Sequence, residues 1–340
     1  MKKYIYCLFL LIFLQGCTAQ KAQEKKINGV SFVANRNPVD SSHVRPVRLI
    51  HANYAAVMPF GFVPQVDQPQ IIYNTDRQWY GETREGGRNY VTELHKGGVK
   101  VMVKPQIWIR NGEFTGYLKM ETEAAWMALE TSYRDFIMDY ATLAQEEGAA
   151  IFCIGTELEQ FVMNRPDFWS QLIIDVRKVY RGKLTYAANW DEYKKISFWN
   201  ELDYIGVDAY FPVCEEQTPS VACAVAGWQR WKEEMSAFAK AQDRKVIFTE
   251  FGYRSVDYTG KEPWKADRSM TNVNLEGQAQ ATQALFDTLW DEEWMAGGFI
   301  WKWFIKHNEV GGPENNQFTP QNKPAEAVIR KHYGKYSLVE

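Results

Sequence analysis

The sequence is poor in the residues that hold metal ions and in the motifs that hold phosphate groups. Only five His and five Cys occur among 340 residues, and neither type is grouped at the spacing of a zinc site. No G-x-G-x-x-G or Walker sequence is present, which removes the usual sign of a nucleotide-binding fold. The formal net charge is −3, and no basic stripe is present that would follow a phosphate backbone. We therefore expect neither a metal ion, nor a cofactor, nor a nucleic-acid partner.

The first residues, by contrast, have the composition of an export signal. Two lysines precede an apolar run over residues 4–14, which has the length of a signal peptide and is too short to span a membrane. The sequence Leu-Gln-Gly-Cys that ends at Cys17 resembles a bacterial lipobox, which predicts loss of residues 1–16, lipidation of Cys17 and a polar tether over residues 17–27. A secretory signal cut near Ala19 and an uncleaved anchor are the alternatives. We expect an exported lipoprotein, facing the periplasm or the cell surface, that touches the membrane only through its lipid.

Three further cysteines follow the signal. Cys214 and Cys223 are close together in a loop-like stretch, and an oxidising compartment would allow them to pair, which would stabilise the fold by roughly 2 to 3 kcal/mol. Two free thiols are the alternative. Cys153 lies within an apolar run and is interpreted as a small core residue.

Eight short apolar or β-branched runs alternate along the chain with helical patterns. The predicted strands cover residues 29–34, 54–62, 100–108, 150–157, 184–190, 204–211, 245–253 and 297–305, and the clearest helical patterns cover residues 123–147, 167–180, 228–241 and 275–294. Strand followed by helix, repeated, predicts a parallel sheet, and eight repeats fit a closed (β/α)8 TIM barrel better than an open doubly wound sheet. The first unit is weak, because residues 38–50 make a poor helix. No linker marks a second domain, so we assign residues 28–340 to one barrel.

Two of the predicted strands end in a glutamate. Glu157 ends the fourth and Glu250 ends the seventh, and a barrel builds its active site at the carboxyl ends of its strands. Because side chains alternate along a strand, Glu157 shares a face with Cys153, and Glu250 shares a face with Phe248. If that face is the barrel interior, both carboxylates point into one mouth. Glu159 has the same parity as Glu157 and is the rival candidate.

Two glutamates in one mouth suit the retaining hydrolysis of a glycosidic bond. That reaction needs one protonated carboxyl group, which donates to the leaving oxygen, and one ionised carboxylate, which attacks the anomeric carbon from roughly 5 to 5.5 Å away. Burial and mutual repulsion raise the pKa of one group and separate the two roles. The alternative is that one glutamate is a structural ion-pair partner, for example of Arg254 or Lys302.

The segments around both glutamates resemble glycoside hydrolase family 113, which consists chiefly of β-mannanases. The resemblance rests on Ile154-Gly155-Thr156-Glu157-Leu158 and Phe248-Thr249-Glu250-Phe251-Gly252-Tyr253, and extends to Lys104-Pro105-Gln106, Val207-Asp208-Ala209-Tyr210 and Gly298-Phe299-Ile300-Trp301. It implies a retaining barrel enzyme with Glu157 as acid/base and Glu250 as nucleophile. Thr156 stands where most members of the wider clan have an Asn that binds the sugar 2-hydroxyl, which leans away from the cellulase and xylanase branches.

Other residues at the strand ends are candidates for substrate binding, with core packing as the alternative for each. By the resemblance, Trp301 forms the floor under the sugar at the cleaved bond. Tyr210 could donate a hydrogen bond to Glu250, and Asp208 would need a partner if buried. The remaining candidates are Asn189, Trp190, Lys104 and Trp108. The long loops over residues 212–226 and 254–274 would wall the cleft.

These observations lead to two hypotheses of different classes. The first is a monomeric retaining endo-β-glycosidase that cleaves β-1,4-mannan or manno-oligosaccharides by double displacement, with xylan or glucan as alternative substrates. The second is a lipoprotein that binds a β-linked polysaccharide or oligosaccharide without cleaving it.

Overall fold

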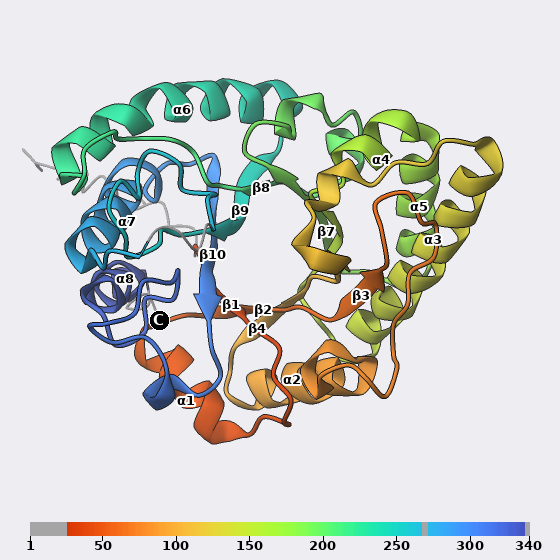
Figure 1. Ribbon diagram of the computed structural model, residues 1–340, viewed down its shortest axis with the longest axis horizontal. Coiled ribbons are helices and arrows are strands. Elements are labelled where there is room, and N and C mark those ends of the chain that lie inside the picture. The colour runs from red at the N-terminus through yellow and green to blue at the C-terminus, as the bar shows by residue number, and fades with distance from the viewer. Residues whose placement is uncertain (1–25, 267–270, 337–340) are drawn as a thin grey trace, which may run out of the picture.

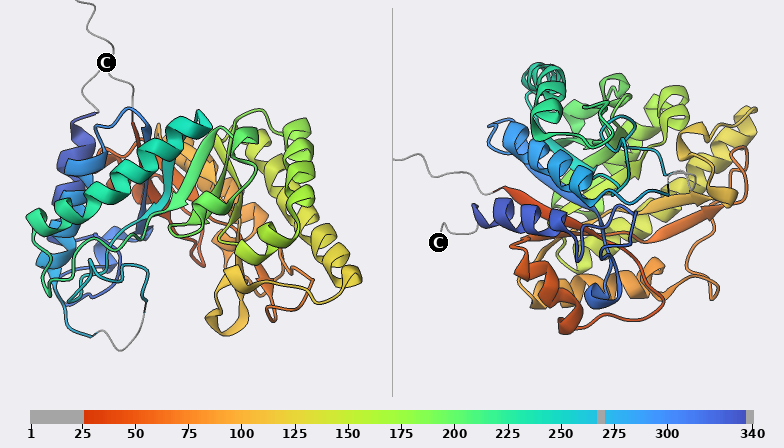
Figure 2. Two further views of the ribbon diagram at one scale, coloured as in Figure 1. Left: turned by 90° about the horizontal axis from the view of Figure 1, so that it is seen from above. Right: turned by 60° about the vertical axis from the view of Figure 1, so that its left-hand side comes forward.

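Eight parallel strands close into a barrel in the order β1-β10-β9-β8-β7-β6-β4-β2 (Figure 1, Figure 2). The strands are β1 (Ile27–Phe32), β2 (Tyr54–Val57), β4 (Lys100–Val103), β6 (Ile151–Thr156), β7 (Lys183–Asn189), β8 (Tyr204–Asp208), β9 (Lys245–Phe251) and β10 (Met295–Trp303). The structure, a computed structural model, describes residues 26–266 and 271–336. The predicted export signal, Cys17 and nearly all of the predicted tether lie outside these residues. The predicted (β/α)8 barrel is confirmed.

Helices surround the barrel (Figure 1). Those within the described residues are α1 (Ser41–Leu49), α2 (Arg84–Lys96), α3 (Glu123–Glu146), α4 (Glu159–Asn164), α5 (Pro166–Val179), α6 (Val221–Gln242), α7 (Leu275–Leu289) and α8 (Pro324–Gly334). Within residues 26–266 and 271–336, no helix has the length and apolar content needed to cross a membrane.

Helix α1 forms where the sequence predicts only a poor helix. Pro46 lies inside it and removes one backbone hydrogen bond, which weakens the sequence pattern. Two local features compensate. Asp40 caps the amino end, and the His43 side chain accepts the Asp40 N–H in return, while Val44 and Val47 are buried against the barrel.

Strand β1 closes the barrel by pairing with β2 on one side and with β10 on the other. Lys26, just before β1, donates from Nζ to the Met295 carbonyl at 2.5 Å. The Tyr333 hydroxyl of α8 donates to the Gly29 carbonyl at 2.8 Å, across 304 positions of the chain. The two ends of the described chain are therefore joined directly.

Two predicted strands are each divided in two by a proline. Residues 54–62 form β2 and then β3 (Phe60–Val63), and residues 100–108 form β4 and then β5 (Gln106–Ile109). Proline lacks the N–H that a ladder needs, so Pro59 and Pro105 interrupt the barrel strands. Beyond them β3 and β5 pair in parallel as a separate two-stranded ribbon, which continues outward from the carboxyl end of the barrel.

The inside of the barrel is filled by buried residues that all come from strands: Ile27, Ala56, Met102, Ile151, Cys153, Ala187, Ile247 and Phe299. The position of Cys153 agrees with its interpretation as a core residue, and it is a free thiol. Ile247 belongs to this interior set, whereas Phe248 packs outward against Trp228 of α6, with ring centroids 6.3 Å apart. The face of Phe248 is therefore not the interior face, and the condition that the alternation set for β9 is not met.

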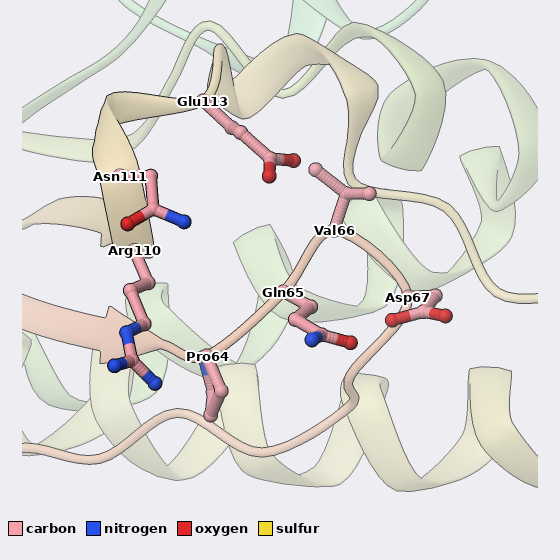
Figure 3. Close-up of a pocket in the computed structure, with 7 residues that line it drawn as sticks. All are labelled: Pro64, Gln65, Val66, Asp67, Arg110, Asn111 and Glu113. Atoms are coloured by element: carbon pink, nitrogen blue, oxygen red, sulfur yellow. The ribbon is translucent and has the colours of Figure 1, made fainter.

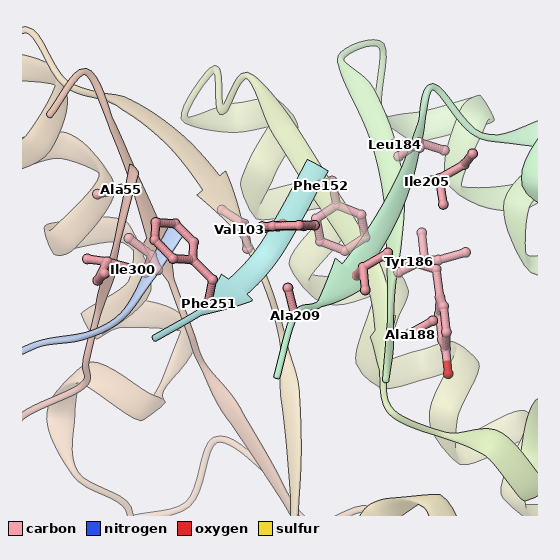
Figure 4. Packing of buried hydrophobic residues seen from close by; sticks show 14 of the residues in the cluster. Ala55, Val103, Phe152, Leu184, Tyr186, Ala188, Ile205, Ala209, Phe251 and Ile300 are labelled. Carbon is pink, nitrogen blue, oxygen red and sulfur yellow. The ribbon is translucent and has the colours of Figure 1, made fainter. Parts of the chain in front are cut away.

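Two irregularities in the ladder lie just before the two glutamates. The register shifts between Cys153 and Thr156 on β6, and again where β9 passes from Phe248 to Glu250. Such β-bulges insert an extra residue and reverse the alternation of side chains beyond it. A second apolar layer fills the space between strands and helices, and Figure 4 shows part of it.

Candidate active site

Glu250 lies near the end of β9, where three side chains donate hydrogen bonds to its carboxylate. Oε1 accepts from Lys104 Nζ at 2.6 Å and from Gln106 Nε2 at 3.0 Å. Oε2 accepts from the Tyr210 hydroxyl at 2.8 Å, which is the contact suggested by the sequence. Three convergent donors, one of them cationic, favour a negative charge on this buried group.

Lys104 and Asp208 form the lower part of the same cluster, and both are fully buried. Lys104 Nζ is 3.3 Å from Asp208 Oδ1, and the Thr249 hydroxyl donates to that oxygen at 2.7 Å. Burial tends to lower the pKa of Lys104, but the carboxylates of Asp208 and Glu250 outweigh it and the net shift is upward. Burial is the main cause of a raised pKa of Asp208, to which the charge of Glu250 adds. Asp208 thus belongs to a structural network.

Glu157 follows β6 directly, in the left-handed backbone region with φ of 50°. This conformation is uncommon for residues other than glycine, and it is held by the Glu157 N–H, which donates to the Ala187 carbonyl at 2.8 Å. The pKa of Glu157 is raised well above its ordinary value, first by burial and then by the charges of Asp208 and Glu250. Glu157, Asp208 and Glu250 therefore interact electrostatically.

The structure separates Glu157 from its rival. Glu159 is the first residue of α4, and its carboxylate pairs with Lys195 at 2.5 Å in an exposed position. Glu250 does form an ion pair, and its partner is Lys104, at 2.6 Å, which the sequence did not name for this role.

Aromatic and amide groups lie at the ends of β7 and β10 and in the loop after β9. Trp301 is half-buried near the end of β10, with the Lys302 ammonium 5.5 Å from its ring centroid. Trp190 follows β7 and stacks on Trp264 of the loop after β9, at 5.2 Å and 25°. Asn189 ends β7 opposite Asp208 in the ladder, and its side-chain oxygen accepts the Trp190 N–H at 3.0 Å.

Trp108 lies farther from this cluster. It is on the outer ribbon, in β5, with half of its surface exposed. Lys104, with which the sequence grouped it, is fully buried in the cluster around Glu250.

Three residues near the site are missing from the candidates chosen by sequence. Gln106 and Thr249 are polar residues next to predicted site residues, and a polar side chain in an apolar run was the available signal. Glu192 had no such signal, because it lies in a turn. It is buried, it accepts the Asn189 N–H at 2.9 Å, and burial raises its pKa to about 7. Its charge also contributes to the raised pKa of Glu157.

Cys214 and Cys223 are joined by a disulfide, the first of the two alternatives. It ties the segment after β8 to the first turn of α6. These cysteines and Glu216 form a compact group of potential metal ligands within the described residues, but the bonded sulfurs offer no thiolate.

Comparisons with known proteins agree on one family. A family model described as Glycoside Hydrolase Family 113 matches residues 37–323. The fold is similar to a GH113 β-mannanase, AaManA, from Alicyclobacillus acidocaldarius in complex with ManMIm, at 25% identity and a TM-score of 0.80, covering 93% of this chain and 99% of that one. A complex of another GH113 β-1,4-mannanase is similar at 23% identity and a TM-score of 0.80, covering 91% and 99%. Fungal β-1,4-galactanases share the fold at 12% identity and a TM-score of 0.57, covering 89% and 98%. No curated protein sequence matches the chain.

Proposed function

This chain belongs to glycoside hydrolase family 113 and is a glycoside hydrolase, and from that premise we propose that it cleaves internal bonds of β-1,4-mannan or manno-oligosaccharides, with retention of configuration. The similarity to a β-mannanase over 93% of the chain supports mannan as the substrate. The observation that carries the mechanism is the difference in environment between Glu250 and Glu157.

Glu250 is the proposed nucleophile. Attack on the anomeric carbon needs an ionised carboxylate in a fixed orientation. The ammonium of Lys104 supplies the compensating charge, and the donors of Gln106 and Tyr210 hold the two oxygens in place. The bond between Glu250 and the sugar forms as the bond to the leaving oxygen breaks.

Glu157 is the proposed acid/base. Its raised pKa keeps the carboxyl group protonated, so that it can donate to the leaving oxygen. Part of that upward shift comes from the charge of Glu250. Once Glu250 becomes an ester its charge is gone, the pKa of Glu157 falls, and Glu157 can take a proton from the attacking water. The same electrostatic interaction therefore serves both steps.

The surrounding residues are assigned to the sugar. Trp301 offers an indole face near the cleaved bond, and aromatic faces pack well against the apolar faces of pyranose rings. The side-chain amide of Asn189 and the stacked pair of Trp190 and Trp264 lie on the β7 side of the site. We propose that they contact the sugars next to the cleaved bond.

The test measures hydrolysis of mannan, glucomannan, xylan and glucan by the wild type, Glu157→Gln and Glu250→Gln, with Glu159→Gln as the matched control. We expect the wild type to release manno-oligosaccharides. Because configuration is retained, NMR should detect the β-anomer of the product first. Both site variants should lose at least about 10²-fold of this activity. On a 2,4-dinitrophenyl β-mannoside, whose leaving group needs no proton, Glu157→Gln should form the glycosyl-enzyme but hydrolyse it slowly. Full activity in either site variant contradicts the assignment. Binding without hydrolysis by the wild type favours the glycan-binding alternative.

We also propose that the chain is exported and lipidated at Cys17. The lipobox-like sequence supports this, and the disulfide is compatible with an oxidising compartment. Labelling with an alkyne fatty acid should mark the wild type and not Cys17→Ser. An unlabelled wild type that is recovered as a secreted protein supports the alternative signal instead.

A further inference from the structure

The ribbon of β3 and β5 begins at the proposed nucleophile and leads away from it. Gln106, the first residue of β5, donates to Glu250 at 3.0 Å. Side chains two positions apart share a face, so Trp108 continues the face of Gln106. In the neighbouring strand, Phe60 pairs with Gln106 and Phe62 pairs with Trp108, so both phenylalanines lie on that face as well.

Burial confirms which face of the ribbon is open. Gly61, Val63, Ile107 and Ile109 are buried, whereas Phe60 and Phe62 are half-buried and Trp108 is 50% exposed. The open face therefore carries three aromatic rings, those of Phe60, Phe62 and Trp108. From Gln106 to residue 110 the strand advances by about 13 Å, which is longer than one sugar ring.

Two connected hollows of about 330 and 380 Å³ lie at the outer end of this face, and both are lined by Pro64, Arg110 and Asn111. The larger one also includes Phe62 and Trp108. The smaller one is completed by the side chains of Gln65, Val66, Asp67 and Glu113, and Figure 3 shows the loop after β3 facing the end of β5 across it. Among the described residues, Arg110, Asp67 and Glu113 form no ion pair with one another or with other groups.

The chemistry of this hollow fits a neutral sugar. Guanidinium, amide and carboxylate groups supply donors and acceptors that match sugar hydroxyls, and Trp108 supplies a flat apolar surface beside them. Two carboxylates and one guanidinium leave a negative balance, which disfavours phosphate, sulfate and uronic acid groups. A free glutamate or aspartate also accepts two hydroxyl hydrogen bonds without needing a counterion.

We propose that the ribbon and its end hollow form a distal subsite, which binds a sugar residue of the β-glycan chain beyond those that contact the catalytic pair. This inference rests on the proposed function, because the glycan chain is the substrate of that site. It makes affinity depend on chain length, since only a chain long enough to run from Glu250 to Arg110 reaches both places.

The test compares Trp108→Ala, Arg110→Ala and Asp67→Ala with the wild type on mannobiose, mannotriose and mannohexaose. Leu49→Ala is the matched control, because it removes an apolar side chain that is 59% exposed at the end of α1, on the opposite end of the barrel. We expect KM for mannohexaose to rise about tenfold, the equivalent of roughly 1.4 kcal/mol of lost contacts, with a smaller rise for the shorter sugars and no rise for the control.

Binding of the same sugars to Glu250→Gln, alone and combined with Trp108→Ala, separates this inference from the catalytic one. Calorimetry should show mannohexaose binding that weakens about tenfold in the combined variant. If the wild type hydrolyses nothing but the binding loss is found, the subsite stands and the proposed hydrolysis fails. The subsite is refuted if hydrolysis is found but the variants raise KM and the dissociation constant equally for short and long sugars. It is also refuted if neither quantity rises.

Discussion

Replacement of Lys104 by methionine tests the buried charge cluster most directly. Lys104 is fully buried and neutralises two carboxylates, those of Asp208 and Glu250. Methionine has a similar length and no charge, so the two carboxylates would face each other without a cation. Removing one member of a buried ion pair costs about 3 to 5 kcal/mol of folding free energy.

The cost should depend on pH in a defined direction. Burial and the charge of Glu250 already raise the pKa of Asp208, and Lys104 opposes that rise. In the variant this opposition is gone, so the pKa of Asp208 rises further above its unfolded value and the folded state binds more protons than the unfolded state. The loss of unfolding free energy in Lys104→Met, relative to the wild type, should therefore be smallest near pH 5. This loss should grow as the pH rises toward 8. Glu250 also loses the cationic donor that favours its charged form, so the acidic limb of kcat/KM should move to higher pH.

Urea unfolding of Lys104→Met, Asp208→Asn and the double variant at pH 5 and pH 8 measures the stability part, and a pH profile on a soluble mannan measures the catalytic part. The double variant holds one carboxylate fewer and should recover part of the loss, giving a coupling energy above 1 kcal/mol between the two positions. A loss of unfolding free energy below about 1 kcal/mol at pH 8 in Lys104→Met, together with an unchanged acidic limb of kcat/KM, would refute this prediction.

Three further outcomes are expected. Tyr210→Phe removes one hydrogen bond to the charged Glu250, so kcat should fall about 10- to 150-fold in steady-state assays while KM changes less, and an unchanged kcat would exclude that role. Glu192→Gln removes a negative charge that raises the pKa of Glu157, so the alkaline limb of kcat/KM should move to lower pH; a shift to higher pH would show that the two groups do not interact as described. Reduction of the disulfide beside α6 should lower the free energy of unfolding by about 2 to 3 kcal/mol, measured with and without dithiothreitol, and an equal midpoint in both would contradict it.

The barrel and the two glutamates proposed as the catalytic pair were accessible from sequence because parallel strands buried on both faces produce long apolar runs, and a charge at the end of such a run stands out. The hydrogen bond between Tyr210 and Glu250 was also within reach, since both residues end strands that meet at one mouth. These predictions depend on the order of residues within single strands, which periodicity does record.

The features that were missed depend on contacts between strands. A β-bulge is an irregularity in the pairing of two neighbouring strands. The alternation within β9 alone therefore put Phe248 and Glu250 on one face, although a register shift lies between them. The pairing of Lys104 with Asp208 and Glu250 joins three strands, and the sequence could place Lys104 only as a residue lining the cleft. Pro59 and Pro105 marked the start of the ribbon, but their meaning required knowing that β3 and β5 lie side by side.

The closure of the barrel by β1 and β10 has a consequence for the order of events in folding. Ile27 of β1 pairs with Gly297 of β10, almost the whole length of the domain away in sequence. Joining them costs about 5 kcal/mol of loop-closure entropy before the hydrogen bonds of the last strand are gained. A chain released before β10 is complete therefore keeps one edge of β1 unpaired, and its barrel stays open. The contacts of Lys26 and Tyr333 then act last, as a clasp that forms only when both ends of the domain are present. Folding should accordingly be slow and nearly all-or-none, with truncation at either end removing the closed state rather than trimming it.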